Sequence, residues 1–170
     1  MLVSLAIRCI RESEWELYRQ LRLNALLESP HAFASTFEQA LKRSGESWQE
    51  QVSSSASGSE RYTALVFDEG RPVGMGAVYE IAQSQAELLQ MWIKPEFRSS
   101  GIGKTLVDHL ECWVFDHGFT KLIATVHREN PRAITFYMNQ GYQTDVEAMR
   151  TAPQRDHILF KSYKGKKEIN

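Results

Sequence analysis

The most informative stretch of this chain is residues 90–105, QMWIKPEFRSSGIGKT. The first part of the stretch is apolar and favours a strand that ends at Pro95, and a Gly/Ser-rich segment then leads into a helix from about Ile102. Backbone N–H groups at a helix start lack partners within the helix and carry the positive end of its dipole. Glycines such as Gly101 and Gly103 let an anion approach the backbone closely. The stretch is typical of a phosphate-binding loop, and a plain strand-to-helix turn is the alternative.

Two nucleotide-binding motifs can be tested on the same residues. Gly103-Lys104-Thr105 looks like the end of the P-loop pattern GxxxxGK[ST], but position 98, which must be glycine in that pattern, is Arg98. The dinucleotide pattern GxGxxG also fails, because Leu106 stands where the third glycine belongs. A P-loop nucleotide binder is therefore a disfavoured alternative.

The elements around this stretch follow the order β-α-α-β-β-β-α-β-α-β-β. Strands are expected over 2–8, 62–67, 72–81, 86–94, 121–126, 142–150 and 157–163, and helices over 13–29, 35–52, 102–117 and 131–140. Capping boxes at Ser13–Glu16 and Ser35–Glu38 support the first two helices. Residues 53–59, SSSASGS, indicate a flexible, disordered hinge. Gly74 and Gly76 inside a strand indicate a close backbone approach or a bulge.

Composition excludes several classes of protein. The 170 residues suffice for one domain over 1–170, and a formal net charge of -1 gives no support to a nucleic-acid binder. No apolar run is long enough to span a membrane, and no secretion signal is recognisable, so we expect a cytoplasmic protein. Cys9 and Cys112 lack metal-ligand spacing, and we expect them to be reduced, buried and inert, with no metal bound. We interpret residues 161–170, with Lys161, Lys164, Lys166 and Lys167, as a solvated basic tail.

Two motifs together resemble the GNAT N-acetyltransferase superfamily. The pattern Arg98-x-x-Gly101-x-Gly103 matches the acyl-CoA pyrophosphate loop [RQ]xxGx[GA] of that family. A second segment matches at the appropriate distance, and it reads Asn130-x-x-Ala133-Ile134-x-Phe136-Tyr137-x-x-x-Gly141-Tyr142. The order of elements matches over nearly the whole chain. The resemblance implies an α/β fold, a single GNAT (acyl-CoA N-acyltransferase) domain whose mixed, mostly antiparallel sheet has about seven strands flanked by about four helices.

The resemblance also implies where acetyl-CoA, the acetyl donor, binds. In the family, two neighbouring strands splay into a V that holds the pantetheine arm, and here they correspond to Glu87–Lys94 and Lys121–His127. Backbone groups of Met91 and Ile93 are expected to pair with pantetheine, and Asn130 either contacts its amides or only caps the following helix. The expected cofactor-binding residues are Met91, Trp92, Ile93, Arg98, Ser99, Ser100, Gly101, Ile102, Gly103, Lys104, Thr105, Asn130, Ala133 and Phe136.

The implied chemistry needs a base for the amine and an acid for the CoA thiolate. Tyr137 holds the family's acid position, and the alternative is that it only packs with Phe136. Some family members have a Glu base where this chain has Thr125, which cannot serve as a base. The substitutes, in order of preference, are Glu87, Glu80 and His127, and ordered water is a further alternative.

The acceptor is expected to be a primary amine, either a small molecule or a peptide. Candidate residues on the acceptor side are Trp15, Arg22, Pro30-His31-Ala32-Phe33 and Phe37, although aromatic residues in such positions more often belong to the core. The expectation includes neither nucleic acid nor membrane as a partner and leaves a homodimer open. A non-catalytic acyl-CoA-binding sensor is the alternative function, because such a protein would keep the loop without needing Tyr137.

Overall fold

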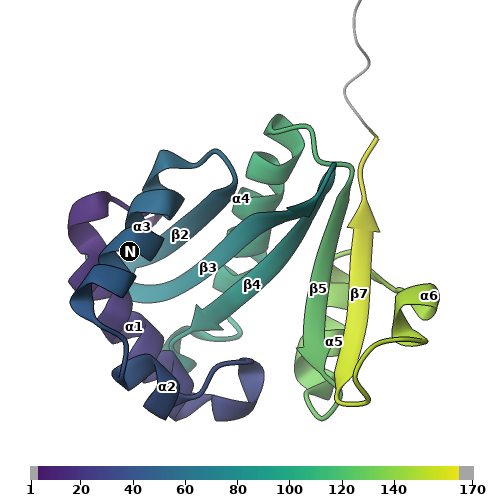
Figure 1. The fold of residues 1–170 in the computed structure, drawn as a ribbon, viewed down its shortest axis with the longest axis horizontal. Helices are drawn as coiled ribbons and strands as arrows, with labels where there is room; N and C mark the ends of the chain where they lie inside the picture. The colour runs from purple at the N-terminus through teal and green to yellow at the C-terminus, as the bar shows by residue number, and fades with distance from the viewer. Residues whose placement is uncertain (1–3, 165–170) are drawn as a thin grey trace, which may run out of the picture.

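The computed structural model describes residues 4–164, which form a seven-stranded sheet with helices on both faces (Figure 1). The strands are β1 (Leu5–Cys9), β2 (Arg61–Asp68), β3 (Arg71–Ala82), β4 (Gln85–Ile93), β5 (Lys121–His127), β6 (Gln143–Thr144) and β7 (Asp156–Ser162). The helices are α1 (Trp15–Glu28), α2 (Phe37–Leu41), α3 (Gly45–Ser57), α4 (Ile102–Asp116), α5 (Pro131–Asn139) and α6 (Val146–Met149). Three short 3₁₀ helices are η1 (Glu12–Glu14), η2 (Pro30–Ala32) and η3 (Pro95–Phe97).

The sheet has the order β1-β2-β3-β4-β5-β7-β6, and β4 with β5 is its parallel pair. The remaining neighbours are antiparallel, so the predicted mixed, mostly antiparallel sheet of seven strands is confirmed. A parallel pair needs a crossover connection, and α4 supplies it between β4 and β5. The described part of the chain has six α-helices where about four were predicted, because short helices form around residues 37–41 and 146–149.

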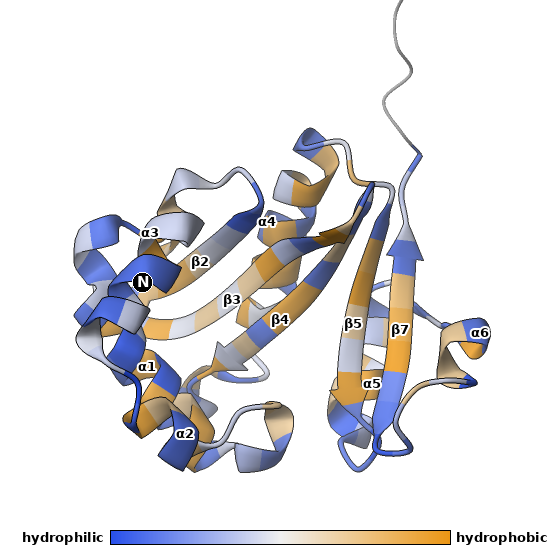
Figure 2. Cartoon of the chain, in the orientation of Figure 1, coloured by the Kyte–Doolittle hydropathy of each residue, from blue (hydrophilic) through white to orange (hydrophobic). Residues whose placement is uncertain are grey.

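Two apolar clusters bury the two faces of the sheet. Helix α4 presents Leu106, Leu110 and Val114, spaced four residues apart and fully buried, to one face. Alternate residues of β5 point to the same cluster, which also includes Tyr137 of α5. Helices α1 and α3 cover the other face with a second cluster around Tyr18 and Trp48. Figure 2 shows the apolar residues along β4, β5 and β7, with hydrophilic residues on the outer sides of α1 and α2.

Strands β4 and β5 separate part of the way along their length (Figure 1). They pair from Gln85–Leu88 to Lys121–Ala124 and no further. Beyond that point, β3 pairs Met75 with Trp92 but Ala77 with Leu89, so β4 has one extra residue there. Gln90, in this bulge, has a positive φ of 57°. A bulge bends its strand and increases its twist, and this bend turns β4 away from β5 and opens the V.

The predicted close approach at Gly74 and Gly76 is confirmed. A Cβ at Gly76 would lie 2.5 Å from Met91 Sδ, and one at Gly74 would lie 2.9 Å from the Trp92 carbonyl oxygen. Both distances are too short for a carbon atom. At Gly74 the neighbour is β4 backbone, so β4 can lie this close to β3 only because β3 has glycine there, whereas at Gly76 the glycine makes room for the Met91 side chain.

Replacing Gly74 by alanine is therefore expected to lower the free energy of unfolding by about 1–3 kcal/mol, the usual cost of overpacking. The added Cβ meets backbone, which cannot rotate away as a side chain can. Urea denaturation measures the loss. Gly45→Ala is the matched control, because its Cβ meets the Trp15 ring at an ordinary 3.5 Å. Equal stability of Gly74→Ala and the natural protein would contradict this account of the β3–β4 contact.

The predicted disordered hinge at residues 53–59 is wrong, because α3 continues through Ser57 and ends at Gly58 with a φ of 67°. Serine hydroxyls bond to carbonyls of the same helix: Ser54 and Ser55 both donate to the Gln51 carbonyl, at 2.8 and 3.0 Å. Ser55 is also buried against β2, where Thr63 donates to it. A serine-rich composition therefore does not prevent a helix whose hydroxyls find backbone partners and whose inner face is packed.

The first helices begin at other residues than predicted. Both capping boxes are shifted: Thr36 and Gln39 form one, at 3.2 and 2.9 Å, and the Glu14 side chain accepts from the Arg11 backbone N–H in the other. The expected single helix over 35–52 is two helices, since Ser44 caps a new one, α3. Thr36 provides one position later the capping chemistry expected of Ser35. Arg11 has no side-chain acceptor, so that helix start keeps only the half of the box in which Glu14 accepts from the backbone.

Two predictions near the end of the chain need correction. The expected strand over 142–150 is only β6 followed by α6, because the Asp145 side chain caps a new helix by accepting from the Ala148 N–H at 3.0 Å. Lys161 is not part of a solvated tail: it lies in β7 and pairs with Glu111 at 2.8 Å. Lys166 and Lys167 lie outside the described residues, as does the expected start of the first strand at Leu2.

The cysteines are both free, but only one is partly buried. Cys9 is half-buried, and burial raises the pKa of its thiol, whereas Cys112 is exposed on α4, contrary to the expectation that it is buried. No helix within residues 4–164 is long and apolar enough to cross a membrane.

Candidate functional site

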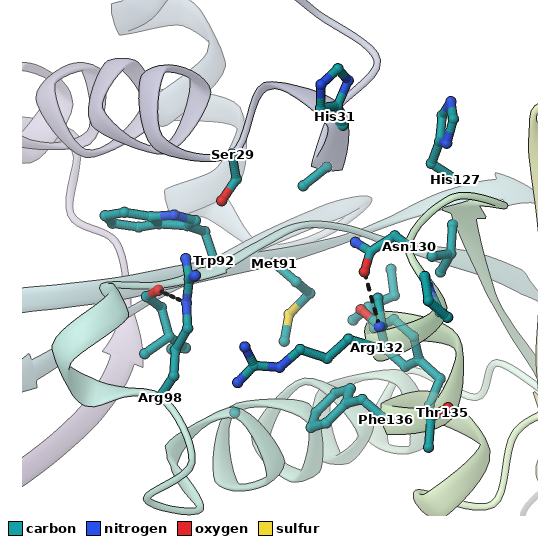
Figure 3. A pocket seen from close by; sticks show the side chains of 18 of the residues that line it. Ser29, His31, Met91, Trp92, Arg98, His127, Asn130, Arg132, Thr135 and Phe136 are labelled. Atoms are coloured by element: carbon teal, nitrogen blue, oxygen red, sulfur yellow. Dashed lines mark hydrogen bonds between the residues drawn. The ribbon is translucent and has the colours of Figure 1, made fainter.

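The opening of the V forms a cleft of about 1040 Å³. Its walls come from β4, β5, the loop before α4, the first turns of α5 and the end of α1 with η2 (Figure 3). Segments far apart in the sequence therefore meet at one cavity, large enough for an extended organic ligand.

The loop between β4 and α4 presents unpaired backbone N–H groups. Gly101 is the N-cap of α4, with a φ of 86°, and has no side chain to bond to the first turn. The first intrahelical bond is donated by Thr105 to the Gly101 carbonyl, so the N–H groups of Ile102, Gly103 and Lys104 lack helical partners. Gly101, Gly103 and Lys104 line the cleft. This geometry suits an anion, as the sequence predicts.

The Arg98 side chain has a different role from the backbone of its loop. Its Nε donates to the Ile93 carbonyl at 2.9 Å, and its Nη2 pairs with Glu28 of α1 at 2.6 Å. Trp92 Nε1 donates to the same carboxylate at 2.9 Å. Sequence analysis missed Glu28, which ties α1 to the end of β4 and neutralises the Arg98 charge. The Arg98 hydrogen bonds lower the pKa of Glu28 to about 2.

Replacing Glu28 by glutamine is expected to destabilise the fold at neutral pH but not in acid. The folded-state pKa lies below the value of about 4.3 for an unfolded chain, so this stabilisation is present above about pH 4.3 and is lost as the pH falls toward 2. The pair is partly exposed, and a loss of about 1 kcal/mol is expected at pH 7. Urea titrations from pH 7 to pH 3 should show the two curves converging.

Glu147→Gln is the matched control for this titration, since the Glu147–Arg150 pair is far more exposed and should contribute little. A difference between Glu28→Gln and the natural protein that stays constant down to pH 3 would show that the Glu28 charge is not what stabilises this junction.

The free edge of β4 faces β5 across the cleft. Lys94 N donates to the Val73 carbonyl, and alternation along an antiparallel pair then directs the backbone groups of Ile93 and Met91 toward the gap. The Ile93 carbonyl is taken by Arg98, so its N–H remains for a ligand. The pairing of the Met91 and Ile93 backbone groups with pantetheine stays a prediction.

Helix α5 contributes the opposite wall. The Asn130 side chain accepts from the Ala133 N–H at 3.1 Å, so Asn130 caps the helix, and its predicted contact with pantetheine stays a prediction (Figure 3). The Phe136 ring would lie 3.5 Å from a Cβ at Gly103, so the two helix starts are in contact. Arg132, which sequence analysis missed, reaches across the cleft, and its Nη2 lies 3.4 Å from Ser99 Oγ (Figure 3). Its position between two motif residues was the available signal.

Tyr137 lines the cleft on α5, although its side chain is largely buried. Its ring packs edge-on against Phe136 and Tyr142, with centroids 5.2 and 5.3 Å away. Its hydroxyl has no hydrogen-bond partner among residues 4–164 and is not one of the fully buried unpaired atoms, so it is open to the cleft. Burial raises the pKa of Tyr137, and the phenol therefore stays protonated.

The predicted bases are placed differently from one another. Glu87 lies behind the wall: Tyr79 OH donates to Oε2 at 2.9 Å, and Thr125, which lines the cleft, donates to Oε1 at 3.0 Å. Glu80 is exposed on β3, next to Tyr79. Because successive side chains of a strand alternate, Glu80 points to the face of the sheet opposite to that of Tyr79 and Glu87. His127 lines the cleft, but its Nδ1 accepts from the Glu129 N–H at 3.2 Å, which leaves its Nε2 as the N–H when the ring is neutral.

Three predicted cofactor residues do not line the cleft. Ser100 Oγ donates to the Phe97 carbonyl at 2.6 Å, Thr105 Oγ1 donates to the Gly101 carbonyl at 3.1 Å, and Ile102 is buried in the core. Their side chains shape the loop, so only their backbone groups can reach a ligand. The other predicted cofactor residues line the cleft, namely Met91, Trp92, Ile93, Arg98, Ser99, Gly101, Gly103, Lys104, Asn130, Ala133 and Phe136.

Of the predicted acceptor residues, the turn at Pro30–Ala32 lines the cleft. Trp15, Phe33 and Phe37 pack against the cluster around α1, as aromatic residues more often do. Arg22 is buried with its guanidinium 4.4 Å from the centroid of the Phe33 ring.

A parallel strand pair that splays beside a helix start with unpaired N–H groups, with a capped helix on the facing wall, is the arrangement that the resemblance to the acyl-CoA-dependent GNAT superfamily implied. The family model described as "Acetyltransferase (GNAT) family" matches residues 14–142. The chain therefore belongs to the GNAT acetyltransferase family, and the resemblance drawn from the sequence is confirmed.

Curated relatives match part of the chain. A spermidine N(1)-acetyltransferase of Thermoplasma acidophilum is 33% identical over 84 residues, which are 49% of this chain and 49% of that protein. A [ribosomal protein bS18]-alanine N-acetyltransferase of Escherichia coli is 25% identical over 95 residues, 56% of this chain and 64% of the other. The matched regions thus span about half to two thirds of these relatives.

Solved structures match nearly the whole fold. The PaiA N-acetyltransferase of Thermoplasma acidophilum, solved in complex with coenzyme A, has a TM-score of 0.78 at 24% identity and covers 94% of this chain and 99% of its own. A GNAT-family acetyltransferase of Streptococcus pneumoniae has a TM-score of 0.76 at 17% identity, with 95% and 100% covered. At these identities, the likeness concerns the fold.

Proposed function

We propose that this protein transfers the acetyl group of acetyl-CoA to a primary amine, with Tyr137 as the general acid. The observation that carries the proposal is the juxtaposition of unpaired N–H groups at the start of α4 with an open Tyr137 hydroxyl on the facing wall of one cleft. The first suits a pyrophosphate and the second a departing thiolate.

The ends of the donor fit different parts of the cleft. The N–H groups around Gly103 would hold the pyrophosphate, and the Arg132 guanidinium, which has no carboxylate partner among the described residues, would add a positive charge beside it. Lys104 contributes less, since Asp108 neutralises it at 2.6 Å. The pantetheine arm would then run along the free edge of β4 toward Tyr137.

In the reaction, the neutral amine nitrogen attacks the thioester carbonyl carbon, an N–C bond forms and the C–S bond breaks. The sulfur takes a proton from the Tyr137 hydroxyl, and the nitrogen loses one to the base, so the products are an acetamide and the free thiol of CoA. The Tyr137 phenolate recovers its proton from solvent. We propose Glu87, acting through Thr125 or a water molecule, as the acceptor of the amine proton, because its carboxylate lies one hydroxyl behind the cleft wall.

Two measurements test this function. Calorimetry should show that coenzyme A binds to the protein, and a thiol-detection assay should show release of CoA that depends on both acetyl-CoA and an added amine. Binding of coenzyme A without thiol release for any amine would point to a non-catalytic acyl-CoA sensor. Absence of binding would overturn the assignment of the cleft.

A further inference from the structure

The bulge residue Gln90 carries a side chain that the proposed transfer does not use. Gln90 lines the cleft, and its side-chain oxygen accepts from Tyr18 OH of α1. Tyr18 OH in turn accepts from Gln51 Nε2 of α3 at 3.0 Å. Tyr18 is almost fully buried, so both helices hold the Gln90 carboxamide in one orientation.

This chain of hydrogen bonds makes Gln90 a donor toward the cleft. Its oxygen is occupied, so Nε2 is the free end, and no described residue accepts from it. The fully buried polar side-chain atoms without a partner within residues 4–164 are Arg22 Nη1, Trp48 Nε1 and Tyr163 OH, and Gln90 Nε2 is not among them. The amide N–H groups therefore open into the cleft, on the face of β4 that α1 and η2 cover.

Other groups at this end of the cleft are also donors or cations. His31 and His127 lie on opposite sides of the opening (Figure 3), and His127 presents an Nε2–H when neutral because its Nδ1 accepts from the Glu129 backbone. Arg22, one helical turn from Tyr18, is 6% exposed and has no carboxylate within ion-pair distance in the described part of the chain. Arg22 itself does not line the cleft, but its buried charge has no ion-pair partner there.

Carboxylates are scarce at the same place. The two that line the cleft are Glu28, neutralised by Arg98, and Glu129, which is exposed to solvent and therefore screened. A polyamine carries several positive charges and would meet donors and cations instead of acceptors. An oxygen acceptor on the substrate would pair with Gln90.

The position of the proposed base, Glu87, also favours an amine that loses its proton easily. Glu87 reaches the cleft only through Thr125. The α-amino group of a peptide has a pKa of about 7.7–8.0, so roughly one molecule in six to one in eleven is neutral at pH 7, against about one in 2,500 for a lysine-like amine. A site whose base lies behind the cleft wall suits the less basic peptide amine, because more of it is already neutral.

We infer that the acceptor carries a carbonyl or carboxylate oxygen on the carbon next to its amine, as an amino acid or a peptide N-terminus does, and that Gln90 Nε2 donates to this oxygen. The inference rests on the proposed acetyl transfer and names the substrate class of the same cleft. Gln90 is then a specificity-determining residue, and Tyr18 is a positioning residue that orients it.

Initial rates with four acceptors test the substrate class: free alanine, alaninamide, an amidated peptide with N-terminal alanine, and spermidine. At least one of the three alanine acceptors should exceed spermidine tenfold or more in kcat/KM. The three alanine acceptors show which oxygen is recognised. Acetylation of free alanine alone indicates a carboxylate, and acetylation of alaninamide and the peptide indicates a neutral carbonyl. A preference for spermidine, or binding of coenzyme A without acetylation of any alanine acceptor, overturns the inference.

Gln90→Glu tests the residue. The variant keeps the Tyr18 hydrogen bond and replaces the donor by an acceptor of similar shape, so kcat/KM for the preferred alanine acceptor should fall at least tenfold, with a smaller change for spermidine. The effect is expressed as the ratio of kcat/KM between the variant and the natural enzyme for the same acceptor, so differences in amine pKa between acceptors do not affect it. Gln85→Glu, the same change on the same strand outside the cleft, should leave both rates unchanged.

Calorimetry with coenzyme A keeps the two hypotheses apart. Unchanged affinity in Gln90→Glu together with the lost alanine rate supports the inference, and equal losses for all acceptors, or none, refute it. If the natural protein does not bind coenzyme A, the proposed function itself is wrong.

Discussion

Tyr137→Phe is expected to lower kcat by about 10²–10⁴-fold, the usual contribution of a positioned general acid. The variant loses one hydroxyl that has no hydrogen-bond partner among residues 4–164, so the packing of its ring on Phe136 and Tyr142 is retained. The loss should appear in kcat and leave the affinity for coenzyme A unchanged, because the proton is needed only as the C–S bond breaks. Single-turnover thiol release and calorimetry measure the two quantities.

Tyr142→Phe provides the matched control. Its hydroxyl donates to Glu111 at 3.0 Å outside the cleft, so its removal should cost stability, about 1 kcal/mol, but leave kcat within a few fold. If Tyr137→Phe keeps a near-natural kcat, Tyr137 is a packing residue, solvent protonates the thiolate, and the general-acid assignment is wrong.

Gly103→Val is expected to weaken coenzyme A binding at least tenfold, or about 1.4 kcal/mol. Valine places a branched side chain where the N–H groups at the start of α4 meet the pyrophosphate. The protein itself tolerates the first added atom, because a Cβ at Gly103 would lie 3.5 Å from the Phe136 ring, an ordinary contact. Calorimetry measures the affinity, and circular dichroism checks the fold.

Gly103→Ala shows whether a loss of coenzyme A affinity comes from the first added carbon or from the branched side chain beyond it. Alanine adds only the tolerated Cβ, so it should weaken coenzyme A less than valine does. Equal affinity of a folded Gly103→Val variant and the natural protein would mean that the ligand does not approach this helix start, and the loop assignment would fail.

Local features of the sequence predicted the parts of the fold that local chemistry controls. The β4–α4 loop, the Asn130 cap and the glycines that face β4 each depend on a few neighbouring residues, and each was found where expected. Helix boundaries were less predictable, since Thr36 and Ser44 cap as well as the residues first chosen. The serine-rich segment was misjudged because composition does not reveal that Ser55 is buried against β2.

The family, the succession of the seven strands and the glycine loop before α4 could be predicted from the sequence, because these follow from motifs and periodicities that are contiguous in the chain. How side chains distant in the sequence meet depends on the packing of the whole fold. Glu28 reaches Arg98 across 70 positions, and Tyr18 reaches Gln90, the residue in the β4 bulge, across 72. Strand register decides whether the Glu87 carboxylate reaches Thr125, and register is a property of pairing between strands that no single segment encodes.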